Sequence, residues 1–286
     1  MITRRKFLES TAAGLAGAVV TARRLAAEEP AGTAPKIRVS SCSAGGLADA
    51  KRAGLDGVEV RVGDPADTLQ IADPAVRQRY KDEMKETGLA ISSFMMGLLN
   101  SNPLASDPRG PAWLEQSIEA AGDLKAGVIL VAFFGKGSLK DGQGVKKADV
   151  DAVVERLKAA APKAKEAGTI LGIENTLSAA QNLEILQRIG HDSVRIYYDV
   201  YNLAGEGYDT LAEIRLLKDR ICQFHFKNGP DHLETGKVRF EPVAEVIREI
   251  GYRGWIVLET SSPSKDRVAD AKRNADYVRK LFGLTA

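Results

Sequence analysis

The sequence is poor in cysteine, histidine and aromatic residues, and it has almost no net charge. Of its 286 residues, two are cysteine and three are histidine, while phenylalanine, tryptophan and tyrosine together make up 6%. Two cysteines provide no disulfide framework, so the fold has to rest on a hydrophobic core. A formal net charge of +2 gives no basic surface of the kind that binds nucleic acid. We therefore predict no nucleic-acid partner.

The first 35 residues are interpreted as a twin-arginine signal peptide and linker, outside the fold. Arg4 and Arg5 precede a short, weakly hydrophobic run of small residues, whereas a spanning helix needs about 20 apolar residues. We expect export by the twin-arginine route to the periplasm or the cell exterior, with no stable membrane span in the mature chain. Because no clean Ala-x-Ala site occurs near Ala26 and Ala27, an uncleaved membrane anchor is the alternative.

From residue 36 onward, β-type runs alternate with helical patterns, which is typical of a parallel α/β fold. Such alternation over about 250 residues predicts a single (β/α)8 TIM barrel spanning residues 36–286. The Gly-rich stretch 135–144 is interpreted as a flexible loop or a lid, because it lacks the complete glycine pattern of a nucleotide-binding loop. The expected strands span 37–42, 57–62, 89–95, 128–133, 169–174, 194–199, 221–225 and 255–259. The expected helices span 47–54, 74–88, 111–126, 147–168, 182–190, 211–219, 242–251 and 265–282.

The last four β-type runs each end in a residue that can ligate a metal. Successive ends are separated by roughly one strand–helix unit, so in a parallel barrel the four side chains converge on one rim. Three carboxylates and one imidazole suit Mn²⁺, Mg²⁺, Co²⁺ or Zn²⁺: the oxygen count favours Mn²⁺ or Mg²⁺, and the histidine favours a transition metal. We expect Mn²⁺. The predicted ligands are Glu174, Asp199, His225 and Glu259.

Short motifs around these positions indicate a family. They are Gly57-Val-Glu-Val60, Gly172-Ile-Glu-Asn175, Tyr198-Asp-Val-Tyr-Asn202, His225-Phe-Lys-Asn228 and Leu258-Glu-Thr260. In this order they resemble the xylose isomerase-like TIM-barrel superfamily, in particular the sugar phosphate isomerase/epimerase group that includes ketose 3-epimerases and relatives of endonuclease IV. The resemblance covers the chain from about residue 37 to its carboxyl end, and it implies the same four metal ligands.

The resemblance implies an isomerase or epimerase acting on a small sugar. The metal would hold the carbonyl oxygen and a neighbouring hydroxyl of a keto sugar and stabilise an enediolate. Glu174 and Glu259 would then exchange the proton as base and acid. Two alternatives stay open: a 3-keto-glycoside lyase or hydrolase with the same metal and base, and a non-catalytic, metal-containing sugar-binding protein. An exported location favours neutral or oxidised sugars over phosphorylated ones.

Strand alternation suggests supporting residues and the direction of one cysteine. Glu59 and Arg61 share one strand face, where they could contact substrate hydroxyls or form an ion pair. Lys227 lies two residues beyond His225 and could stabilise enolate charge or pair with a carboxylate. Cys222 is predicted to point away from His225, toward a helix, as a buried unpaired thiol.

Two asparagines and three aromatic residues complete the candidate site. Asn175 and Asn202 are predicted to bind substrate or support the ligands. The aromatic residues are interpreted as core residues or, alternatively, as a sugar-stacking wall. They are Trp113, Phe133 and Phe134.

Departures from the family pattern narrow the substrate class. Ketose 3-epimerases usually carry a histidine and an arginine where this chain has Asn202 and Asp231, and many relatives carry a histidine in place of Thr176. These differences disfavour a free-ketose 3-epimerase. A three-zinc cluster of the endonuclease IV type needs more histidines than this chain has, so we do not expect DNA repair activity.

Overall fold

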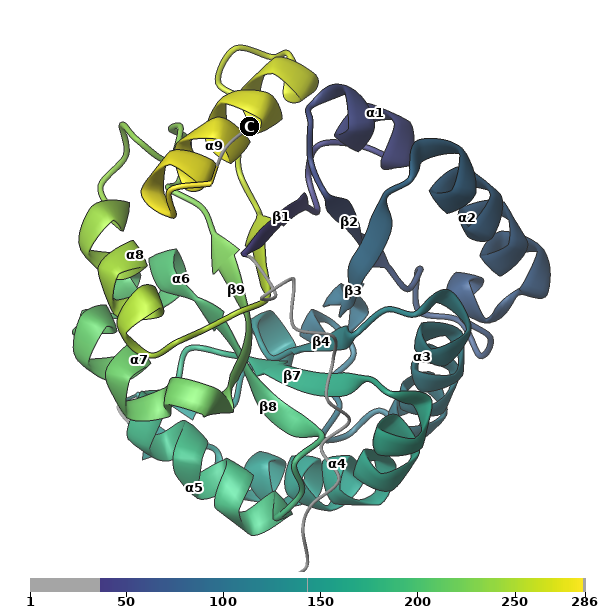
Figure 1. Ribbon diagram of the computed structural model, residues 1–286. Helices are drawn as coiled ribbons and strands as arrows, with labels where there is room; N and C mark the ends of the chain where they lie inside the picture. Colours follow the sequence, from purple (N-terminus) through teal and green to yellow (C-terminus); the bar gives the residue numbers. More distant parts are fainter. Residues whose placement is uncertain (1–36, 143, 285–286) are drawn as a thin grey trace, which may run out of the picture. The chain divides into compact units, whose positions relative to one another are not determined.

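Eight parallel strands close into a barrel with the order β1-β10-β9-β8-β7-β4-β3-β2, and helices surround them (Figure 1). β1 closes the ring by pairing with both β2 and β10. The computed structural model describes residues 37–142 and 144–284, so the predicted signal segment and linker lie outside the described residues. The predicted TIM barrel is confirmed. Within the described residues, no helix is long and apolar enough to cross a membrane.

The element bounds follow the predicted strand–helix alternation. The barrel strands are β1 Arg38–Ser41, β2 Gly57–Arg61, β3 Ala90–Met96, β4 Val128–Ala132, β7 Ile170–Glu174, β8 Val194–Asp199, β9 Ile221–Phe226 and β10 Trp255–Leu258. The α-helices are α1 Leu47–Arg52, α2 Pro74–Thr87, α3 Gly110–Leu124, α4 Lys147–Ala167, α5 Ala179–Ile189, α6 Val200–Gly205, α7 Thr210–Leu217, α8 Phe240–Glu249 and α9 Arg267–Leu281. Short 3₁₀ turns span η1 Gln70–Ala72, η2 Gly97–Asn100, η3 Gly135–Gly137 and η4 Lys218–Arg220.

The Gly-rich stretch after β4 contains a two-stranded hairpin, β5 Lys140–Asp141 with β6 Gly144–Val145. Lys140 pairs with Glu206 and its ammonium lies 5.4 Å from the centre of the Tyr208 ring. The stretch is therefore held to the segment that follows α6, and its role as a lid stays a prediction.

A bulge in β9 overturns the prediction for Cys222. Ile196 pairs with Ile221 and Tyr197 with Gln223, so Cys222 is an extra residue in the ladder. Its side chain packs against the cluster of residues inside the barrel, not against a helix. The prediction was wrong because strand alternation assumes an unbroken ladder between Cys222 and His225. Cys42 and Cys222 are both free thiols, in keeping with the absence of a disulfide framework.

Asp270 joins α9 to two loops that follow barrel strands. Its buried carboxylate accepts hydrogen bonds from Ser262 Oγ at 2.6 Å and from the Ser264 amide at 3.1 Å, and His232 Nε2 lies 2.8 Å from its other oxygen. Burial raises the pKa of Asp270, but the bonds from Ser262, His232 and Ser264 outweigh it and hold the pKa at about 2.

We expect Asp270→Asn to lower the free energy of unfolding by about 1–3 kcal/mol at neutral pH, because an amide leaves one of the donors unpaired. The folded pKa of about 2 lies below the unfolded value, which is about 3.9. The carboxylate therefore stabilises the fold fully above about pH 4, and its contribution is lost as the pH falls toward 2. Urea unfolding should show the difference from wild type shrinking over that range. Asp276→Asn on the exposed face of α9 is the control, and an equal effect of both variants would contradict the prediction.

Candidate active site

Four strand ends bring the predicted metal ligands together. Glu174 ends β7, Asp199 ends β8, His225 lies in β9 and Glu259 directly follows β10. One ligand atom from each of the four side chains lies within 4.8 Å of the others. Asp199 and His225 are partners in the β8–β9 ladder, so the barrel register itself places them side by side. Their role as ligands stays a prediction, but the convergence on which it depends is present.

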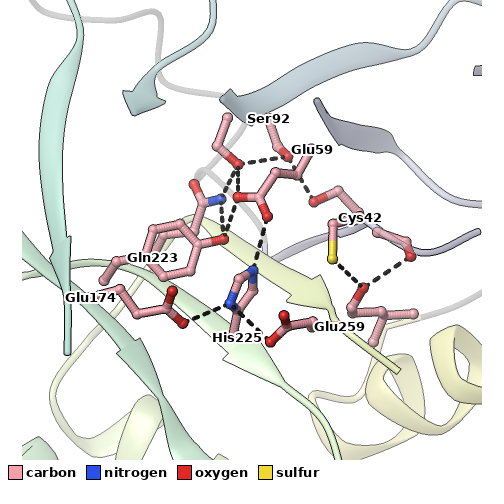
Figure 2. Close-up of polar contacts among 12 residues, drawn as sticks. Cys42, Glu59, Ser92, Glu174, Gln223, His225 and Glu259 are labelled. Atoms are coloured by element: carbon pink, nitrogen blue, oxygen red, sulfur yellow. Dashed lines mark hydrogen bonds and ion pairs between the residues drawn. The ribbon is translucent and has the colours of Figure 1, made fainter. Parts of the chain in front are cut away.

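His225 Nδ1 lies at the centre of this cluster. It is 2.9 Å from Glu174 Oε1, 3.5 Å from Glu259 Oε2 and 4.0 Å from Asp199 Oδ2. Figure 2 shows Glu174 and Glu259 on opposite sides of the imidazole, and Glu59 reaching its other nitrogen. One ring nitrogen therefore faces three carboxylates, which is the arrangement a cation between them would need.

The hydrogen bonds and charges of these four side chains fit a divalent cation. Asp199 is 1% exposed, and its Oδ1 accepts a hydrogen bond from the Asn202 amide at 2.7 Å. Its Oδ2 accepts no hydrogen bond from the described residues, although Lys227 Nζ lies 3.0 Å away. The Lys227 ammonium is shared between Asp199 and Glu259, so it offsets only part of the charge of the three carboxylates, and a divalent cation would offset the remainder. Three carboxylates and one imidazole suit Mn²⁺, Mg²⁺, Co²⁺ or Zn²⁺.

The two candidate acid–base residues have opposite pKa shifts. Burial raises the pKa of Glu174 to about 7, against the opposing effect of His225. Burial also acts to raise the pKa of Glu259, but His225 and Lys227 outweigh it, and that pKa is lowered. A cation in the cluster would lower both values, because it favours the charged carboxylates. Carboxylates with separated pKa values are typical of acid–base pairs.

Glu59 holds the histidine from behind instead of facing a substrate. Its Oε1 lies 3.0 Å from His225 Nε2, and its Oε2 accepts hydrogen bonds from Ser93 Oγ at 2.7 Å and from the Tyr197 hydroxyl at 2.8 Å. A carboxylate on the second nitrogen fixes the orientation of a metal-binding imidazole. Arg61, by contrast, lies at the exposed end of β2, and the described residues form no ion pair between it and Glu59.

A cavity of about 250 Å³ opens beside the cluster, between the ends of β3, β4, β7, β9 and β10. Its polar wall carries Glu174, Glu259, Lys227 and Asn202, and its apolar wall carries Met95, Leu130, Ala132 and Phe134. Of the three aromatic residues considered for stacking, only Phe134 lines it, since Trp113 and Phe133 are buried in the core. A larger hollow of about 460 Å³ lies between α6, α7 and α8 and is lined by none of the predicted site residues.

The profile of the family described as xylose isomerase-like TIM barrel matches residues 47–281. The chain belongs to this family. An L-ribulose 3-epimerase from Mesorhizobium japonicum is 26% identical over 232 residues, covering 76% of this chain and 74% of that protein. A solved L-ribulose 3-epimerase has a TM-score of 0.73 at 22% identity, covering 87% of this chain and 95% of its own. A solved 3-keto-D-glucoside 4-epimerase from E. coli has a TM-score of 0.72 at 17% identity, and the match covers 86% of this chain and 100% of that one. These two structures support the fold alone.

Within this xylose isomerase-like barrel, the remaining predicted residues divide into two groups. Lys227 pairs with Glu259 Oε2 at 2.7 Å, and Asn202 lines the cavity, so both lie where a substrate would bind. The Asn175 amide donates to Asn182 Oδ1 at 2.8 Å and its Oδ1 accepts from the Leu177 amide at 2.9 Å. Asn175 thus secures the turn into α5, and no contact places it in the cavity.

Proposed function

We propose that this chain is a divalent-metal-dependent isomerase or epimerase of keto sugars that transfers a proton through an enediolate. The observation that carries the proposal is the placement of Glu174 and Glu259: both line one cavity and both adjoin the same histidine, from opposite sides. A family relative named as a sugar epimerase supports the same reaction class.

The two carboxylates divide the proton transfer between them. Such a transfer needs one carboxylate ionised and the other protonated at the same moment. Lys227, at 2.7 Å, keeps Glu259 ionised and ready to accept the proton next to the carbonyl. Glu174 lies on the opposite side of His225 and would deliver a proton from that side, and the reverse reaction exchanges the two roles. A bound divalent ion would polarise the carbonyl and stabilise the enediolate.

The test is metal content followed by solvent deuterium exchange. Elemental analysis of the purified chain should find about one Mn, Mg, Co or Zn per chain, and Asp199→Ala should lose it. With metal present, deuterium from the solvent should enter a keto sugar next to its carbonyl, and chelation should stop the exchange.

Two results would replace the proposal. No metal even after reconstitution would rule out the enediolate route and leave a sugar-binding protein that holds no metal. Release of free aglycone from a 3-keto-glycoside, without an epimerised product, would assign a lyase or hydrolase instead.

A further inference from the structure

A second hollow adjoins the cavity beside the carboxylate cluster. It measures about 330 Å³, against about 250 Å³ for the first, and both are lined by Met95 and Gly97, which form the border between them. Pockets that hold a whole ligand usually measure about 300–1,000 Å³. The first cavity alone is smaller than that range, and the two together fall within it.

The second hollow is lined by polar side chains with open hydrogen-bonding capacity. These are Arg61, at the exposed end of β2, together with Asp64, Gln70 and Ser101. None of the four side chains makes a hydrogen bond or ion pair with the residues that the structure describes. The loop between β2 and η1 packs tightly against Gln70 at Gly63. Gly63 has φ 117°, and a Cβ at that position would lie 2.9 Å from Gln70 Cβ.

This set of groups matches a sugar ring better than an anion. A guanidinium, a carboxylate, an amide and a hydroxyl together supply donors and acceptors for several ring hydroxyls. Met95 and Leu98 supply the apolar contact that the C–H face of a ring needs. A phosphate or carboxylate in the same hollow would face the carboxylate of Asp64 as well as Arg61, and the like charge of Asp64 opposes the binding of an anion.

We propose that the substrate is a two-ring keto sugar, whose reacting ring lies beside Glu174 and Glu259 and whose second ring lies in the Arg61 hollow. This inference rests on the proposed function and specifies its substrate class. Arg61, predicted from the sequence to contact substrate, then contacts the ring that does not react.

The test compares deuterium exchange between matched sugars with one ring and with two. The pairs are D-fructose with isomaltulose, turanose or lactulose, and methyl 3-keto-glucoside with 3-keto-cellobiose. In at least one pair the two-ring sugar should have a kcat/KM about tenfold higher or more. Arg61→Ala should lower that value by about tenfold to a hundredfold, because hydrogen bonds to a charged group are lost. The value for the one-ring partner should change by less than about twofold.

Arg79→Ala is the matched control, because Arg79 lies in α2 near Arg61 and does not line the second hollow. It should change neither value. Equal or faster exchange of the one-ring sugar in every pair would overturn the inference. So would an equal loss on both sugars in Arg61→Ala.

Calorimetry with Glu174→Gln separates this inference from the proposed function, since binding needs no proton transfer. If wild type exchanges no sugar, the proposed function fails. The two-ring site still stands if Glu174→Gln binds a two-ring sugar about tenfold more tightly than its partner and Arg61→Ala removes that preference. Equal binding of both sugars, or binding of neither, overturns it.

Discussion

Glu174→Gln is expected to lower the rate of proton exchange by about 10²–10⁴-fold, the range that one acid–base group contributes. Glutamine keeps the size of the side chain and one oxygen that can face His225 Nδ1, which lies 2.9 Å from the present carboxylate. It cannot take up or release the proton. Because Glu174 is buried, replacing its charge with an amide removes a desolvation cost, so the fold should tolerate the change.

The appropriate measurement is the rate of deuterium exchange at saturating metal, with kcat and KM determined separately. The loss of activity should appear in kcat. Glu213→Gln is the matched control: Glu213 is a partly exposed glutamate outside the cluster, bonded to the Ala179 amide at 2.8 Å. It should leave exchange within about twofold of wild type. A Glu174→Gln protein that holds metal and exchanges at the wild-type rate would exclude Glu174 as a proton carrier.

Most helices and strands could be predicted because the residues that start, continue and end each of them lie in one short stretch of sequence. The strand at 194–199 has its predicted bounds, and α2 begins at Pro74 and ends before Gly88, whose φ of 72° stops the helix. The helix α6 was missed. It begins directly after Asp199, whose side chain caps it at the Asn202 amide, while its first residues, Val200 and Tyr201, continue a β-type pattern.

The convergence of the four candidate ligands was predictable because parallel strands end on one rim, so a residue at a strand end has a known place. The partners of each side chain depend on register, which the sequence does not display. A register shift between β2 and β3 places Glu59 opposite Ser93. The bulge in β9 turns the side chain of Cys222 toward the inside of the barrel. Glu59 therefore bonds His225 and not Arg61, two residues away on its own strand.

That contact makes Glu59 a positioning residue with a large expected effect on metal binding. Its Oε1 lies against His225 Nε2, and its Oε2 accepts from two donors, the Ser93 and Tyr197 hydroxyls. Gln223 Nε2 in turn donates to both of these hydroxyl oxygens, at 2.7 and 3.0 Å. The network therefore favours a carboxylate that only accepts, so that with a metal bound the proton would stay on Nε2 and the Nδ1 lone pair would face the metal.

Glu59→Gln is expected to weaken metal affinity by about 10–100-fold. If the glutamine oxygen faces Nε2, its NH₂ meets the Ser93 and Tyr197 hydroxyls, which already donate toward that position. If it flips, the NH₂ faces Nε2, the proton moves to Nδ1, and the nitrogen directed at the cluster loses its lone pair. Chelator competition with Mn²⁺ measures the affinity, ¹⁵N NMR of His225 reports the tautomer, and Glu213→Gln is again the control. Unchanged affinity with Nε2 still protonated would mean that the barrel strands alone orient the imidazole.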